Sequence, residues 1–198
     1  MAMPTNHRRT VKHYHSPGDL HELTFSCLDR KPLLMDDTRR RLLADSLNRA
    51  LTNYNFSLVA FVFMPEHVHL LVYPRGLQAD MEGFLSAVKR PFSYRVKMLL
   101  AEPNDPLLRE LTVPDKKRGT TFQFWLKGPG YDRNLNSRKA ISASIDYFHR
   151  NPVERELCAR AIDWKWSSAR WHLSEGQIVD PELPRLEKLP AGFLDGIG

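Results

Sequence analysis

Two histidines, His67 and His69, stand one residue apart in the stretch MPEHVHLLVYP. Side chains alternate between the two faces of a β-strand, so both imidazoles should point the same way while Val68 points the other way. Imidazoles at positions i and i+2 of a strand can bind one metal ion. His-x-His also occurs often by chance, so two tolerated polar residues on a solvent-exposed sheet face are the alternative interpretation.

The stretch SIDYFHRNPVERE carries a tyrosine and an asparagine at helical spacing. Ile141, Ile145 and Phe148 recur as the apolar stripe of an amphipathic helix. Tyr147 falls on the flank of that stripe, and Asn151 lies one turn further along the same flank. The phenol and the carboxamide can therefore face one point together. From this helix alone, a tyrosine half-packed against a sheet is the alternative.

The histidines lie in the second of two adjoining apolar stretches. FSLVAFVFM is short and partly aromatic and β-branched, which predicts a buried strand. Pro65 interrupts the apolar run, and HVHLLVY resumes it as an antiparallel partner. A further strand is predicted over residues 23–28, and a short strand and turn in FQFWLKGPGYDRNL.

Three helices are predicted around these strands. The aspartates at 36 and 37 can cap the first helix, whose apolar residues recur at helical spacing between positions 42 and 51. The second runs from about 80 to 101, and Pro91 should kink or split it. The third begins at 136 or 137 and should end just before Pro152.

This order of elements predicts an α+β fold, in which an antiparallel sheet has helices packed on one face. Residues 15–173 form the predicted domain, preceded by a flexible basic arm over 1–14 and followed by a proline-rich tail over 174–198. Residues 102–121 are rich in proline, glycine and charge, so we expect a long loop there.

The composition is that of an ordinary globular protein. The 198 residues are 42% hydrophobic and 26% charged, enough for one domain with a sizeable core. A net charge of +6 and a pI near 9.4 favour a polyanionic partner. Two cysteines form no disulfide framework. The start of the chain does not resemble a signal peptide, and no stretch reaches the roughly 20 apolar residues of a membrane span. We therefore expect a cytoplasmic protein.

Three blocks occur in order along the chain: MPEHVHLLV, then FWLKGPGYDR, then DYFHRNPVERELCARAIDWKWSSAR. Together they resemble the REP-associated tyrosine transposases, a branch of the single-tyrosine HUH transposases with an IS200-like domain. HUH stands for His, hydrophobic residue, His. The resemblance covers roughly residues 15–173. Residues 102–121 look like an insertion relative to compact members of the family. The second block is also slightly altered, because Leu126 and Lys127 follow Trp125 where a Trp-Gln-containing sequence is expected.

The resemblance implies a fold, a site and a reaction. The fold would be a ferredoxin-like or RRM-like sheet with the HUH motif on a central strand. His67 and His69 would hold Mg²⁺ or Mn²⁺, with Asn151 as an additional ligand or orienting group. Tyr147 would be the nucleophile that cuts DNA through a 5′-phosphotyrosine and allows rejoining. The substrate would be single-stranded or hairpin DNA from palindromic repeats, handled by a monomer associated with the nucleoid, with a dimer as the alternative.

The residues leave two other functions open. A hairpin-binding protein that does not cut would need none of the four site residues. A small metal hydrolase would use the histidine pair with water as the nucleophile and would not need Tyr147. Glu66 is ranked below Asn151 as a ligand because strand alternation points it to the opposite face. His149, two residues beyond the tyrosine, is a weaker candidate for a role at the site.

DNA binding would require cations for phosphates and aromatic rings for unpaired bases. For each cation the alternative is an ordinary solvated charge, and for each tryptophan it is a core position. The candidates are Arg8, Arg9 and Lys12 in the arm, Lys89, Arg90 and Arg95 on the middle helix, Trp125, and Arg133.

Overall fold

The computed structural model describes residues 19–102, 105–128, 130–190 and 193. The predicted basic arm, with Arg8, Arg9 and Lys12, lies outside the described residues. In the part of the chain that is described, no helix is both long enough and apolar enough to cross a membrane.

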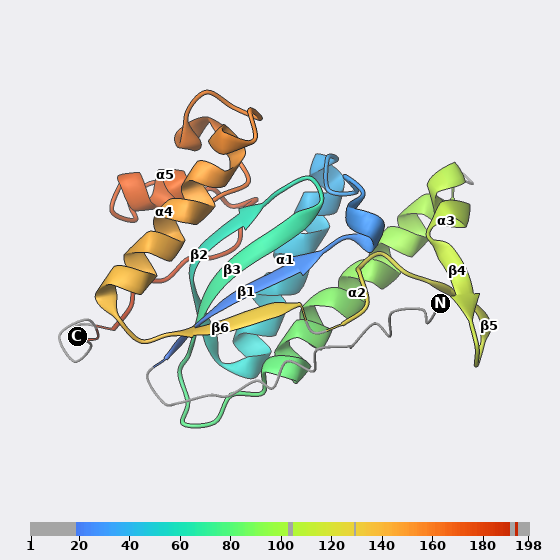
Figure 1. The fold of residues 1–198 in the computed structure, drawn as a ribbon, viewed down its shortest axis with the longest axis horizontal. Helices are drawn as coiled ribbons and strands as arrows, with labels where there is room; N and C mark the ends of the chain where they lie inside the picture. The colour runs from blue at the N-terminus through green and yellow to red at the C-terminus, as the bar shows by residue number, and fades with distance from the viewer. Residues whose placement is uncertain (1–18, 103–104, 129, 191–192, 194–198) are drawn as a thin grey trace, which may run out of the picture.

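Four antiparallel strands form the main sheet, in the spatial order β2-β3-β1-β6 (Figure 1). This confirms the predicted antiparallel sheet and the central position of the strand that carries the histidine pair. Their bounds are β1 (Leu20–Ser26), β2 (Phe56–Phe63), β3 (His67–Pro74) and β6 (Tyr131–Leu135).

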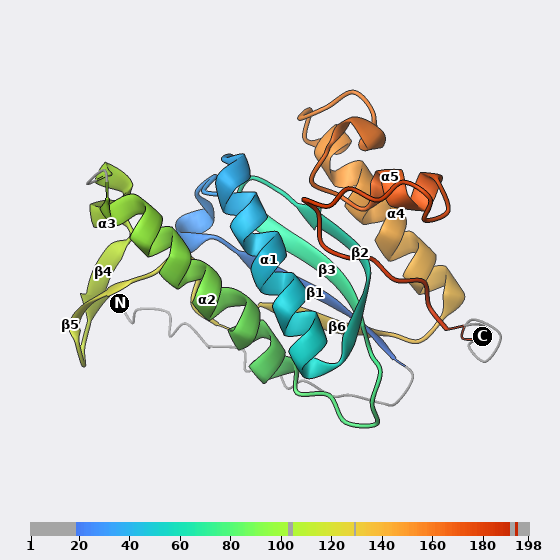
Figure 2. The ribbon, with the colours of Figure 1, turned by 180° about the vertical axis from the view of Figure 1, so that it is seen from behind.

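Long helices lie on both faces of the sheet. The predicted packing of helices on one face holds only for α1 (Asp37–Tyr54) and α2 (Met81–Ala101), whose face is turned toward the viewer in Figure 2. The third helix, α4 (Arg138–Glu154), packs on the other face, against β2 and β3 (Figures 1 and 2). Short helical turns complete the chain: η1 (Leu28–Arg30), η2 (Ala161–Asp163) and α5 (Ala169–Leu173).

The helix boundaries follow local capping. Asp36 accepts a hydrogen bond from the backbone N–H of Arg39 at 3.1 Å, and Ser137 accepts one from that of Ala140 at 3.3 Å. Two proline predictions need correction. α2 is not split at Pro91, and α4 continues through Pro152 to residue 154. Each proline removes one N–H from the helical ladder, and burial of the apolar residues around it holds the helix together.

Strand alternation divides the interior into two clusters. Val68, Leu70 and Val72 of β3 point into the larger cluster beneath α1 and α2. Leu71 points into the smaller one beneath α4, together with Phe148 of that helix. The histidines at 67 and 69 are in phase with Leu71, so the sheet aims them at the α4 side.

Residues 102–121 do not form the predicted long loop. They contain α3 (Pro106–Glu110) and a hairpin of β4 (Thr112–Asp115) and β5 (Gly119–Phe122). Asp105 caps the helix through the N–H of Leu107 at 2.8 Å, and Leu111 behind it is fully buried. Asp115 accepts bonds at 3.0 Å from the N–H groups of Lys117 and Arg118, which closes the turn. The charged composition concealed these local signals.

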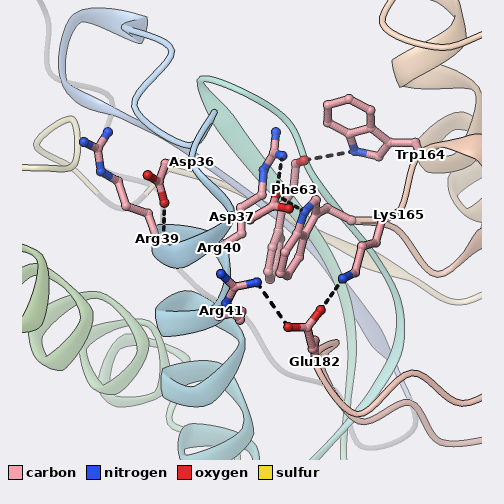
Figure 3. A network of polar contacts seen from close by, with 10 residues as sticks. Asp36, Asp37, Arg39, Arg40, Arg41, Phe63, Trp164, Lys165 and Glu182 are labelled. Atoms are coloured by element: carbon pink, nitrogen blue, oxygen red, sulfur yellow. Dashed lines mark hydrogen bonds and ion pairs between the residues drawn. The ribbon is translucent and has the colours of Figure 1, made fainter.

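The domain also does not end at residue 173, because the segment that follows packs on its surface. Figure 3 shows Glu182 between Arg41 of α1 and Lys165, paired with both side chains. The backbone N–H of Glu187 donates to the carbonyl of Leu58 on β2 at 2.9 Å. Further toward the other end of β2, Phe63 and Phe61 pair with residues 166–168. Residues 166–168 and the segment after residue 173 together cover the outer edge of β2, where an unpaired strand is otherwise prone to associate.

Candidate functional site

The two histidines of β3 meet beneath α4. Their side chains are buried, His67 at 6% exposure and His69 at 5%. The rings are perpendicular, and the Nε2 atoms lie 3.0 Å apart. Both imidazoles thus present the same nitrogen to one point on the α4 side of the sheet.

A fixed partner holds the far nitrogen of each ring. Glu66 Oε1 is 3.0 Å from His67 Nδ1, and Thr24 Oγ1 on β1 is 2.7 Å from His69 Nδ1. A carboxylate only accepts hydrogen bonds, so His67 carries its proton on Nδ1 and leaves Nε2 with a free lone pair. The Thr24 hydroxyl can donate or accept, and so suits either tautomer of His69.

The prediction that Glu66 points to the opposite face is wrong. β3 begins at His67, so strand alternation does not extend back to Glu66, which lies in the preceding turn. There its Oε1 also accepts a bond from Arg155 Nη1 at 2.5 Å. The carboxylate therefore lies behind the His67 ring, where it orients the imidazole and does not face the point where the two Nε2 atoms meet.

α4 adds the tyrosine and the asparagine to the same place. Asn151 is 5% exposed, and its Nδ2 is 3.3 Å from His69 Nε2. A 180° rotation of this carboxamide would place its oxygen, instead of its nitrogen, next to His69 Nε2. Tyr147 is 40% exposed, and its ring lies edge-on to His69 with centroids 5.4 Å apart. Phe148 stacks on the same imidazole at 5.1 Å and fixes its plane. The structure thus brings together all four predicted residues.

The electrostatics keep the imidazoles neutral near pH 7. Burial lowers the pKa of His67 and lowers the pKa of His69 to about 3. The positive charge of nearby Arg30 also lowers both pKa values. Neutral imidazole is the form that binds a cation, so the pair is ready for that role at physiological pH.

The donor set fits a divalent cation. Two nitrogens 3.0 Å apart match two metal–nitrogen bonds of about 2.1 Å that meet near a right angle, as in octahedral coordination. No cluster of three or more His, Cys, Asp or Glu side chains suited to a metal occurs among the described residues. The candidate ligands are therefore the imidazoles of His67 and His69 and the carboxamide of Asn151, whose oxygen would favour Mg²⁺ or Mn²⁺.

Most of the predicted DNA contacts lie elsewhere. α2, with Lys89, Arg90 and Arg95, covers the face of the sheet opposite the histidines. The Lys89 amine lies 4.6 Å above the Phe25 ring, and burial lowers its pKa to about 8. Arg95 pairs with Asp45 at 3.1 Å. These three residues are not brought to the candidate site.

Trp125 is a core residue, which corrects its assignment as a base-stacking side chain. It is 6% exposed, and its ring packs against Phe25 at 4.9 Å and Phe92 at 5.1 Å. Arg133, by contrast, is on the histidine side of the sheet. It lies opposite Glu22 of β1, which in turn lies opposite Leu71 on the α4 side. Its guanidinium contacts that carboxylate at 3.2 Å.

Three neighbours of the site were missed from the sequence: Thr24, Arg30 and Arg155. Arg155 caps the C-terminal end of α4, four residues after Asn151, and continues the spacing of Tyr147 and Asn151, which is a signal that could have revealed it. Arg30 follows β1 in a turn where both Asp29 and Arg30 have positive φ angles, 52° and 53°. That turn is held to the residue before His67 by a 2.8 Å bond from the Cys27 N–H to the Glu66 carbonyl.

Comparison with solved structures identifies the fold. A REP-associated tyrosine transposase bound to a REP hairpin superposes with a TM-score of 0.66 and 16% sequence identity, over 91% of this chain and 94% of that one. The chain has the REP-associated tyrosine transposase fold. A candidate transposase from Deinococcus radiodurans gives a TM-score of 0.41 at 20% identity, over 76% of this chain and 97% of that one. No family model and no curated protein matches the sequence.

Glu66 offers a test of how the transposase-like fold positions its histidine pair. We expect Glu66→Leu to weaken Mn²⁺ binding by about 10- to 100-fold, because His67 loses the partner that fixes its tautomer and orientation. Glu66→Gln keeps an accepting oxygen and should lose less. Calorimetric titration of the DNA-free protein measures both, with Glu154→Gln on the exposed part of α4 as control. Unchanged affinity in Glu66→Leu would show that His67 needs no such support.

His149 faces away from the site and anchors α4. Its Nε2 is 2.9 Å from the Oγ of Ser168, a fully buried residue that also bonds the backbone of Phe61. Burial lowers the pKa of His149 to about 4. The folded protein thus resists protonation of this ring, while the unfolded chain accepts a proton near pH 6.5. The contribution of the neutral His149 ring to the free energy of unfolding is therefore complete above pH 6.5. It is lost as the pH falls from about 6.5 to about 4.

We therefore expect His149→Gln to make folding less sensitive to acid. Between pH 7 and pH 5 the normal protein should lose about 2 kcal/mol through this residue, and the variant should retain that amount. Urea unfolding at both pH values measures the difference. Equal losses in the two proteins would assign the acid sensitivity to the other histidines whose pKa is lowered by burial, His67, His69 and His172.

Proposed function

We propose that this protein is a metal-dependent single-strand DNA endonuclease and strand transferase that acts on hairpin-forming repeat DNA. The observation that carries the proposal is the arrangement around His69. Its Nε2 meets that of His67, Asn151 approaches from α4, and the exposed Tyr147 ring stands 5.4 Å away. A nucleophile beside a candidate cation site is what phosphodiester cleavage requires.

Tyr147 is the nucleophile in this proposal. The phenol gives up its proton to solvent and its oxygen attacks the scissile phosphorus. As the new oxygen–phosphorus bond forms, the bond from phosphorus to the 3′-oxygen of the preceding nucleotide breaks, and that oxygen takes up a proton from solvent and leaves as a hydroxyl. The product is a 5′-phosphotyrosine and a free 3′-OH, so the energy of the broken bond is retained. A 3′-OH from a second strand can reverse the step and join a new end. His67, His69 and Asn151 would hold Mg²⁺ or Mn²⁺, which would neutralise charge on the attacked phosphate.

The residues around the pair have supporting roles. Thr24 and Glu66 hold the imidazoles in place, so the Nε2 atoms stay aimed at the point where the cation would bind. Arg30 and Arg155 place positive charge next to a site that must receive a polyanion. Phe148 and the surrounding core keep water from the inner side of the imidazoles.

Repeat hairpins are the proposed substrate. The net charge of +6 suits nucleic acid, and the transposase with the similar fold was solved with a REP hairpin. Arg8, Arg9 and Lys12 remain proposed phosphate contacts, as does Arg133 on the open side of the sheet. We propose that the protein works as a monomer in the cytoplasm.

The test uses labelled hairpin oligonucleotides taken from repeats that flank the gene. They are incubated with the protein in Mn²⁺, Mg²⁺ or EDTA and separated under denaturing conditions. We expect a labelled band at the mass of protein plus DNA that requires a divalent cation and maps by mass spectrometry to the peptide containing Tyr147. Cleavage without such a band would indicate a hydrolase that uses water. Binding with no cleavage in either metal would indicate a hairpin-binding protein.

A further inference from the structure

A row of side chains crosses the histidine face of the sheet from β3 to β6. His69 is paired with Thr24 of β1, and Thr24 is paired with Tyr131 of β6. Directly opposed residues of antiparallel strands point to the same side of a sheet. The 2.7 Å contact between Thr24 Oγ1 and His69 Nδ1 fixes which side this is. Tyr131 therefore shares the face that carries the candidate site.

The alternation along β6 agrees with this placement. Leu135, four residues on and thus in phase with Tyr131, belongs to the apolar cluster beneath α4. Asp132, out of phase, contacts His21 Nδ1 at 2.9 Å on the opposite side. The positions of Leu135 and Asp132 therefore both indicate that the Tyr131 ring lies on the α4 side of the sheet.

Tyr131 lies where α4 does not cover the sheet. The helix packs against β2 and β3, while β1 and β6 extend away from it (Figure 1). Tyr131 is 48% exposed and Tyr147 is 40% exposed. Neighbouring strands are about 4.8 Å apart, so the Tyr131 backbone lies about 10 Å from that of His69. The two exposed tyrosines therefore flank His69 on one face, Tyr147 from α4 and Tyr131 from β6.

The start of β6 is fixed by a glycine. Gly130 has a φ of +80°, and a Cβ at this position would lie 2.3 Å from the carbonyl oxygen of Thr24. Only glycine lets the chain approach β1 this closely and turn into the strand. The next residue, Tyr131, is thereby placed directly opposite Thr24.

We infer that Tyr131 is a stacking platform for an unpaired base close to the phosphate attacked by Tyr147. The inference rests on the proposed function and adds a binding subsite to it. A half-exposed aromatic ring on an open sheet face can stack any base, because every base has a flat π-face. Two residues further along β6, Arg133 pairs with Glu22 at 3.2 Å and remains a proposed phosphate contact. The Tyr131 ring itself is uncharged, so the contact that it offers is base stacking.

The experiment measures stacking directly, with 2-aminopurine placed in turn at each position around the cleavage site of the hairpin. The Tyr147→Phe protein is the background, because it should bind without cutting. We expect fluorescence to be quenched at one position, the quenching to disappear with Tyr131→Ala, and affinity to fall about tenfold. Tyr131→Phe should preserve both properties. Tyr94→Ala removes a tyrosine that is 65% exposed on α2, beyond the other face, and should change neither.

The results that would contradict the subsite differ from those that would contradict the proposed function. If the normal protein forms its adduct but Tyr131→Ala retains quenching and affinity, the subsite is wrong and the proposed function stands. If Tyr131→Phe loses cleavage in the otherwise normal protein, the hydroxyl has a chemical role and stacking is overturned. If no hairpin binds to the Tyr147→Phe protein or to the normal protein, both the subsite and the proposed function are overturned.

Discussion

Tyr147→Phe is expected to abolish the covalent protein–DNA adduct and to reduce strand cleavage by at least about 10³-fold. The substitution removes one oxygen and leaves the ring that lies edge-on to His69. Without the nucleophile no phosphotyrosine can form, and losses of about 10³-fold or more are typical when a nucleophile is removed. A denaturing gel with end-labelled hairpin gives the cleavage rate, and a gel-shift measurement gives the affinity, which should stay within about twofold.

Tyr94→Phe is the matched control for this prediction. Tyr94 lies on α2, is 65% exposed and is remote from the histidine face, so its hydroxyl should not affect the reaction. Cleavage that persists in Tyr147→Phe would contradict the proposal and make water the nucleophile. Loss of hairpin affinity in the same variant would instead show that the phenol binds DNA.

The sequence was sufficient for the parts of the site that depend on local periodicity. Alternation along β3 predicts that the imidazoles and the side chains of Val68 and Leu70 lie on opposite faces of the sheet. In the structure Val68 and Leu70 are in the larger core cluster, and the imidazoles contact each other on the other face. Helical spacing places Tyr147 and Asn151 on one flank, and the structure turns that flank toward His69. A buried strand and an amphipathic helix each have a strong period, so the faces of both could be predicted.

The remaining features depend on contacts between distant residues. Arg155 and Glu66 are 89 positions apart, and nothing local in either segment indicates their 2.5 Å ion pair. From the sequence Trp125 is a candidate base-stacking residue, with a core position as the alternative. The core position is correct because Phe25 and Phe92, which come from other elements, pack against its ring. The three prolines after residue 173 predict a tail. Its attachment to β2 and α1 depends on partners more than 100 residues away.

His69→Ala should be the second most damaging change. His69 is the residue on which the site converges, because its ring contacts His67, Asn151, Tyr147, Phe148 and Thr24. Removing the imidazole takes away one candidate ligand and the surface against which Tyr147 rests. We expect cleavage to fall by about 10²- to 10³-fold, the usual effect of losing one group that stabilises transition-state charge. Mn²⁺ binding to the DNA-free protein should fall in parallel.

Two measurements separate this effect from a folding defect. His69→Ala also leaves a small cavity beside Phe148, so urea unfolding must show that the variant is folded under the assay conditions. His149→Gln changes a half-buried histidine that anchors α4 without facing the site, and the variant should keep its cleavage rate. If His69→Ala is folded and binds Mn²⁺ as tightly as before, the cation is held elsewhere. In that case the close approach of the two Nε2 atoms is only an imidazole–imidazole hydrogen bond, and the site would have to be reassigned.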